Sequence, residues 1–231
     1  MNGQPTHLGA VGRACYRTEL PSLLGAKISA SCLLWPKLFF QIGEQPDLDD
    51  LVRQFRALLD ANPDALLAVV ITLAPSTNWA LAHPQEMTVY SPRLEDVLPV
   101  NPSRSPEPSW ASQVWREAAA SFLQTTVKHL HEALEGRIVL YQFGSGKCGE
   151  NYPAPDPVRY NQWYCSDYSE PMHAWFRNWL QSHYSSRDAL RKAWGDEHVD
   201  FETAAVPSRE ELLISDWFSF RSPTRSQVTD Y

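Results

Sequence analysis

LLAVVITLA, residues 66–74, is the stretch of sequence that decides the fold. It is almost entirely apolar and rich in β-branched residues, the composition of a strand. A strand with one wet face would alternate apolar and polar residues, so an unbroken apolar run indicates a strand covered on both faces. Such strands are typical of parallel sheets flanked by helices. Pro75 marks the end of the run.

The segments on either side of this run continue the pattern. LFFQIG (38–43) is a short apolar run that predicts a strand, and residues 47–60 carry apolar side chains at helical spacing. Ser112 stands at the N-cap position of a helix expected to run to about Glu135. RIVLYQFG (137–144) predicts the next strand. Strand–helix–strand–loop–helix–strand is the order of a parallel α/β sheet, either open or part of a barrel.

The pattern of the carboxyl-terminal part predicts helices, whereas residues 1–36 show too little periodicity for any helix or strand to be assigned. Ser169 is expected to cap one helix, and Ser185 with Asp188 is expected to start a shorter one that Gly195 closes. The apolar face of the first helix is expected in the core: Met172, Trp175, Phe176, Trp179 and Leu180.

The loops that follow the strands ending at Ala74 and Gly144 are the long ones in this pattern. Parallel sheets and barrels both place their sites in loops at the carboxyl ends of strands. Function is therefore expected in these two loops.

The overall composition narrows the classes of function. The 231 residues carry a formal net charge of −7, which argues against a general binder of nucleic acid or anionic membranes. Nine Trp, nine Tyr and nine Phe make a high aromatic content, which suits sugar rings as well as cores. The four cysteines form no C-x-x-C pair, so neither a metal site nor a disulfide framework is expected. With no signal-peptide pattern and no long apolar stretch, the expected location is the cytoplasm.

YQFGSGKCGENY (141–152) looks at first like a phosphate-binding loop. A P-loop needs a first glycine where Tyr141 stands and a Ser or Thr where Cys148 stands. Pro153, Pro155 and Pro157 follow, so no phosphate-binding helix can begin there. No nucleotide cofactor is expected.

The same stretch presents Glu150 just beyond the end of a predicted buried strand. Burial among aromatic side chains raises the pKa of a carboxyl group, as a general acid requires. The alternative is an ordinary solvated loop glutamate, and spacing alone does not decide between them.

Three further segments resemble the β-galactosidase-like glycoside hydrolases of family 42 and their relatives. They are LAPSTNWALAHPQE (73–86), SWASQVWREAAASFLQTTVKHL (109–130) and WFRNWLQSHYSSRDALRKAWGDEHVDFETAAVPS (175–208). The last is the most specific match, and the resemblance covers about residues 45–231. Residues 1–36 fall outside it and form an unassigned amino-terminal segment.

The resemblance implies a (β/α)8 TIM barrel and a retaining mechanism with two carboxylates. It implies Glu150 as the acid/base, although Gly149 stands where the family usually has asparagine, and the glutamate lies further along the loop. A full barrel needs about 250 residues, so we expect residues 37–231 to form its amino-terminal half, with long βα loops. The family's nucleophile is accordingly expected to be missing from this chain.

Further residues of these loops are candidates for substrate binding: Trp79, His83, Gln142, Asn151 and Tyr152. Trp79 could stack on a sugar or pack under its loop, and His83 could bind a hydroxyl or serve as a turn residue. The substrate is expected to be a carbohydrate, with no cofactor and no metal. The alternative is a non-catalytic barrel fragment with weak sugar binding, whose unpaired strand edges would favour self-association.

Overall fold

The computed structural model describes residues 9–12, 32–35, 37–38, 42–61, 63, 65–89, 107–144, 167–208, 211, 227, 230 and 231. The chain divides into two compact units. Unit 1 comprises Met1–Ser76 and Glu117–Tyr152, and unit 2 comprises Thr77–Arg116 and Pro153–Tyr231. The described strands all lie in one small parallel sheet, which belongs to unit 1.

The sheet is built around β4 (Leu66–Thr72). On one edge, β4 pairs with β5 (Ile138–Gly144) from Leu67 to Thr72. The opposite edge of β4 pairs with β2 (Cys32–Trp35) and then with β3 (Lys37–Leu38), and β1 (Gly9–Gly12) pairs with β2. Every pairing is parallel, as the apolar run of β4 predicts.

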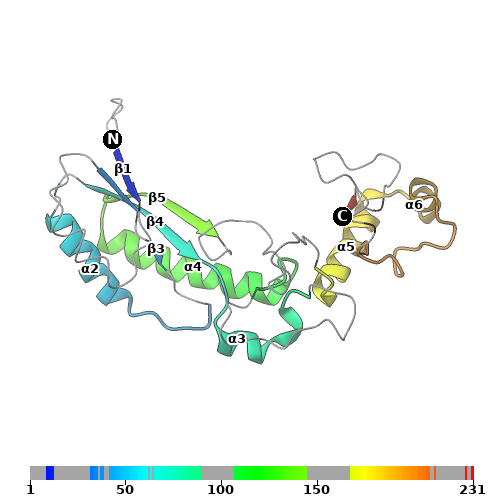
Figure 1. The fold of residues 1–231 in the computed structure, drawn as a ribbon, viewed down its shortest axis with the longest axis horizontal. Helices are drawn as coiled ribbons and strands as arrows, with labels where there is room; N and C mark the ends of the chain where they lie inside the picture. Colours follow the sequence, from blue (N-terminus) through cyan, green and yellow to red (C-terminus); the bar gives the residue numbers. More distant parts are fainter. Residues whose placement is uncertain are drawn as a thin grey trace. The chain divides into compact units, whose positions relative to one another are not determined.

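Helix α2 (Leu48–Ala61) and the part of helix α4 (Gln113–Ala133) that belongs to unit 1 cover one face of this sheet (Figure 1). From β4, Leu67, Val69 and Ile71 point into this core, because alternate residues of a strand share a face. The helices contribute buried residues to the same core: Leu51, Val52, Phe55, Leu58 and Leu59 from α2, and Leu130 from α4.

The opposite face of β4 is buried as well. Ala68, Val70 and Thr72 alternate with the core residues and are 0%, 1% and 4% exposed. The prediction that residues 66–74 form a strand covered on both faces is therefore confirmed for β4.

Unit 2 contains α3 (Thr77–Ala82), the 3-10 turn η1 (Pro84–Glu86), α5 (Glu170–His183) and α6 (Arg187–Trp194). Its core is separate from that of unit 1. The core consists of apolar residues from α5, α6 and the segments that flank them: Tyr168, Phe176, Leu180, Leu190, Val199, Ala204 and Val206.

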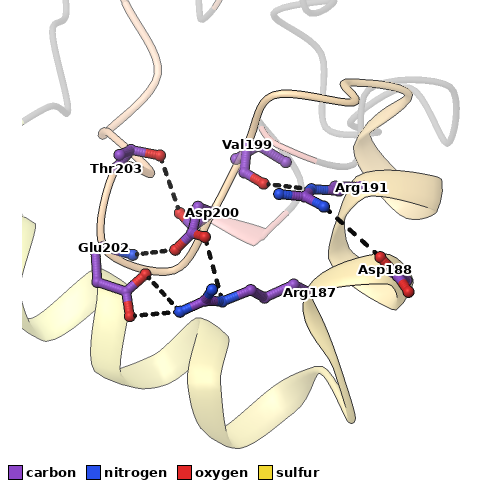
Figure 2. A network of polar contacts seen from close by, with 7 residues as sticks. All are labelled: Arg187, Asp188, Arg191, Val199, Asp200, Glu202 and Thr203. Atoms are coloured by element: carbon purple, nitrogen blue, oxygen red, sulfur yellow. Dashed lines mark hydrogen bonds and ion pairs between the residues drawn. The ribbon is translucent and has the colours of Figure 1, made fainter.

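A network of polar contacts ties residues 199–203 to α6 (Figure 2). The Arg187 guanidinium lies 3.2 Å from Asp200 and 2.9 Å from Glu202. Arg191 donates through Nε to the Val199 carbonyl at 3.0 Å. Salt bridges this exposed contribute little each, so the network mainly orients the turn that follows α6.

The predicted helices at 47–60, from Ser112, and from Ser169 are confirmed as α2, α4 and α5. Ser169 accepts from the Met172 amide as the expected N-cap. In α6 the cap is Ser186, one residue after the expected Ser185, and Gly195 ends the helix with a φ of +68°.

Three expectations need correction. Among the described residues of the expected strand at 38–43, Leu38 belongs to a strand, whereas Ile42 forms an isolated bridge with Pro75 and Gly43 lies in a turn. Residues 1–36, left unassigned, contain β1 and β2, whose four-residue lengths are too short for periodicity to reveal. Trp175, expected in the core, is 43% exposed because it lies beside the buried face that Phe176 and Leu180 define.

Candidate functional site

The two loops expected to carry function start side by side at one edge of the sheet. Thr72 and Gly144 are paired in the parallel register of β4 and β5, so both strands end at the same level. Beyond them, the Leu73 amide donates to the Gly144 carbonyl at 2.8 Å. Adjacent carboxyl ends of parallel strands are where α/β folds place their ligands.

Gln142 lies on β5 opposite Val70 of β4. Residues paired in this way share a face, and Val70 lies on the face away from α2 and α4. Gln142 is therefore a half-buried amide on the sheet face that the helices do not cover. Gln142 lies two residues before the end of β5, close to the carboxyl edge of the sheet.

Trp79 and His83 form a pair on unit 2. They lie one helical turn apart at the end of α3, and their rings stack with centroids 4.3 Å apart and planes 21° from parallel. The His83 Nδ1 is 2.9 Å from the Trp79 carbonyl oxygen. Both side chains are half-buried. The structure thus brings together two of the predicted substrate-binding residues.

This contact fixes how His83 can interact with a ligand. A carbonyl oxygen only accepts hydrogen bonds, so Nδ1 must carry the hydrogen. In the neutral imidazole, Nε2 then holds a bare lone pair that can accept from a hydroxyl group. The pair thus combines stacked aromatic rings with one hydrogen-bond acceptor.

The turn after His83 is anchored to the start of α4 through Glu86. The Glu86 carboxylate accepts from the Ser112 hydroxyl at 2.5 Å, and the Glu86 carbonyl accepts from the Ser109 amide at 2.9 Å. Ser112 in turn caps α4 by accepting from the Trp115 amide at 3.0 Å. The Glu86 carboxylate thereby holds the side chain that caps α4 in place.

Glu150, Asn151 and Tyr152 lie outside the described residues. Their roles stay predictions. Of the remaining candidates, Trp79 and His83 belong to unit 2 and Gln142 to unit 1.

Two polar groups of unit 2, one of them buried and the other half-buried, were not predicted from the sequence. Asp167 is 7% exposed; its Oδ1 accepts from the amides of Val89 at 3.2 Å and Ser169 at 2.9 Å. Its Oδ2 is buried without a hydrogen-bond partner in the described part of the chain. The Asp-x-Ser spacing directly before a helix could have indicated this local turn.

His173 is the second of these groups, and it lies in the first turns of α5. Its pKa is lowered by burial and by the charge of Arg177, against smaller opposing effects of Glu170 and Asp167. In unit 1, burial also raises the pKa of the Tyr141 hydroxyl, which has no hydrogen-bond partner among described residues.

Within the described ranges, no three or more His, Cys, Asp or Glu side chains are grouped so that they could hold a metal ion. A search of the same residues finds no helix with the length and apolarity that a membrane span requires.

Comparison with known proteins gives little similarity. No protein-family model matches the chain, and no curated protein matches it. Among solved structures, the cold-adapted β-galactosidase from Rahnella sp. R3 is similar with a TM-score of 0.48 and 15% identity, over 83% of this chain and 26% of that one. The chain thus spans about a quarter of that protein's length. A likeness at this level decides neither fold nor activity, so the family 42 resemblance and the partial barrel stay predictions.

Proposed function

We propose that the chain is a glycoside hydrolase of the β-galactosidase type, that it forms part of a TIM barrel, and that Glu150 is the acid/base. The observation that carries the proposal is the common end of β4 and β5, where Thr72 and Gly144 pair. The loop with Trp79 and His83 starts from one strand, and the loop with Glu150 starts from its neighbour. The proposal is supported by the fact that the two segments with these candidate residues begin at neighbouring strand ends.

In the proposed reaction Glu150 donates its proton to the glycosidic oxygen while a second carboxylate attacks the anomeric carbon. Glu150 then takes a proton from the water that releases the sugar. Retaining enzymes hold the two carboxyl groups about 5–5.5 Å apart. Among the described residues we assign no nucleophile.

The substrate-binding roles follow from the chemistry of the candidates. Trp79 offers an aromatic surface to the C–H face of a pyranose, and His83 accepts a hydroxyl hydrogen through Nε2. We assign the polar contacts to the substrate to Gln142, Asn151 and Tyr152. The scattered cysteines suit a reducing compartment, and we place the protein in the cytoplasm.

The test compares the full chain with Glu150→Gln on two aryl β-galactosides, one with a good and one with a poor leaving group. General acid catalysis contributes roughly 100- to 10,000-fold. We expect a loss of that order for the poor leaving group and a smaller loss for the good one, which needs little protonation. Glu132→Gln on the exposed surface of α4 is the matched control. Equal turnover by Glu150→Gln and the parent chain would refute the assignment.

A second candidate is a sugar-binding barrel fragment without turnover. Three apolar side chains of β5, Val139, Leu140 and Phe143, are 44%, 45% and 38% exposed. Apolar residues on a strand at the edge of the described sheet suit pairing with more sheet, or self-association. This candidate predicts no turnover, sugar binding that weakens in Trp79→Ala by calorimetry, and concentration-dependent elution from a sizing column.

A further inference from the structure

Residues 204–208 form a segment outside any helix or strand that lies against α5 in unit 2. Arg177 donates through Nε to the Ala204 carbonyl at 3.0 Å. The Val206 amide lies 3.4 Å from Nδ1 of His173, and the Tyr168 hydroxyl donates to the Pro207 carbonyl at 3.0 Å. The segment therefore runs antiparallel to the helix, since later residues of the segment meet earlier residues of the helix.

The segment is part of the core of unit 2. Ala204 and Val206 are 2% and 4% exposed, and both pack in the cluster around Phe176 and Leu180. Around these two residues the backbone is shielded from water and depends on partners from the protein, whereas Ala205 between them is exposed. Two of these partners, His173 and Arg177, project from successive turns of the same helix.

Only one of the three hydrogen bonds depends on a proton near neutral pH. The Val206 amide is a donor, so Nδ1 of His173 must present its lone pair and the hydrogen must sit on Nε2. Adding a proton to His173 fills that lone pair and leaves two N–H groups facing each other. Arginine and tyrosine keep their donor hydrogens through this pH range.

We propose that His173 forms a pH-dependent contact, here called the clasp. The neutral ring accepts the Val206 hydrogen bond and holds residues 204–208 against α5, and the protonated ring cannot accept that bond. The charged groups that act on His173 are Arg177, which opposes protonation, and Glu170 and Asp167, which favour it. From the segment itself, the contacting residues Ala204, Val206 and Pro207 bring no charge. Burial lowers the pKa of His173, so the clasp stays closed at pH 7 and opens below the ordinary histidine value of about 6.5.

The test measures hydrogen exchange of the Val206 amide in the full chain from pH 7.5 to pH 5, corrected for the intrinsic dependence of exchange on pH. A net hydrogen bond is worth about a fivefold change in an equilibrium. We expect the protection of Val206 to fall by about that factor on acidification. The Ala189 amide, which donates to Ser186, should keep its protection because its acceptor does not titrate.

His173→Asn separates the clasp from a purely structural contact. The asparagine Oδ1 stands near the place of Nδ1 and accepts from the amide but does not take up a proton, so protection of Val206 should become independent of pH. His198→Asn, at an exposed histidine of the same unit, should behave like the parent chain.

A measurement on the parent chain alone covers the case in which His173→Asn does not fold. The ring resonances of His173 and the amide resonance of Val206, followed by NMR, should titrate with one shared midpoint below about 6.5. A Val206 amide that does not respond, a midpoint at or above that value, or an unchanged pH dependence in His173→Asn would overturn the proposal.

Discussion

Replacing Phe176 with alanine should unfold unit 2 at lower denaturant while leaving unit 1 in place. Phe176 is 0% exposed at the centre of the unit 2 core. Its ring meets that of Tyr231 edge-on at 5.6 Å and lies nearly parallel to that of Trp194 at 6.2 Å. None of these partners belongs to the core of unit 1.

The expected cost follows from this environment. Removing a buried phenylalanine side chain to alanine costs about 3–5 kcal/mol, because transfer and cavity effects add. Each favourable aromatic pair contributes about 0.5–1.5 kcal/mol beyond burial. With two such pairs lost, we expect a value toward the upper end, at about 4–5 kcal/mol.

The distribution of tryptophan supplies the assay. The chain has nine tryptophans, and Trp35 alone falls within the ranges of unit 1, which leaves eight in unit 2. Tryptophan fluorescence therefore reports mainly unit 2, while far-UV circular dichroism reports both units. Phe176→Ala should shift the fluorescence transition in urea to lower concentration and split it from the dichroism transition.

Leu130→Ala is the matched control, because Leu130 is equally buried in the core of unit 1. It should cost about 2–5 kcal/mol in that unit and change the dichroism transition more than the fluorescence transition. If Phe176→Ala shifts both signals together by the same amount, the two cores do not unfold separately and the reasoning fails.

Two further changes test polar contacts. Ser112→Ala should lower the free energy of unfolding by about 1–2 kcal/mol in urea titrations, since the Trp115 amide loses its cap and Glu86 loses a donor; Ser112→Thr should retain most of it, and equal losses would contradict the capping role. Asp230→Asn should lower the pKa of Tyr184, which burial and then the hydrogen bond and charge of Asp230 raise to about 12. A tyrosine whose pKa is raised in the fold contributes stability that is present up to about pH 10 and is lost as the pH rises toward 12. The variant should therefore lose this stability at a lower pH than the parent chain does. Tyrosinate absorbance is the measurement, and Tyr184→Phe is the reference.

The parts of the fold that could be predicted are those whose sequence carries a complete local pattern. The strand at 66–72 has an unbroken apolar run, and α5 has a serine cap followed by apolar residues at helical spacing. Gly195 adopts the left-handed conformation that ends α6, which is the reason for expecting a glycine there.

The helices and strands that could not be predicted from the sequence are either held by contacts distant along the chain or too short to show a pattern. β1 and β2 are held by pairing with strands further along the chain rather than by their own periodicity. α3 has six residues between Pro75 and Pro84, too few for a helical pattern to stand out from a loop. The stacking of Trp79 on His83 could have been anticipated from their spacing of four, but only if that helix had been recognised first.

The common starting point of the two loops was predictable to a similar extent. Expecting function in the loops after the strands at 66–74 and 137–144 needs only the order of elements, and β4 and β5 do end beside each other, at Thr72 and Gly144. The contact between His173 and residues 204–208 joins positions more than thirty residues apart, so no local sequence pattern indicates it.

The two units have a consequence for how the chain can be made and divided. The chain passes from unit 1 to unit 2 after Ser76, returns after Arg116, and leaves again after Tyr152. Each unit is therefore assembled from separate stretches of sequence, with part of the other between them. During synthesis, β4 leaves the ribosome well before β5, its partner on one edge, and must wait for it. No single cut in the gene separates the two units, because a piece that contains all of one unit also carries part of the other.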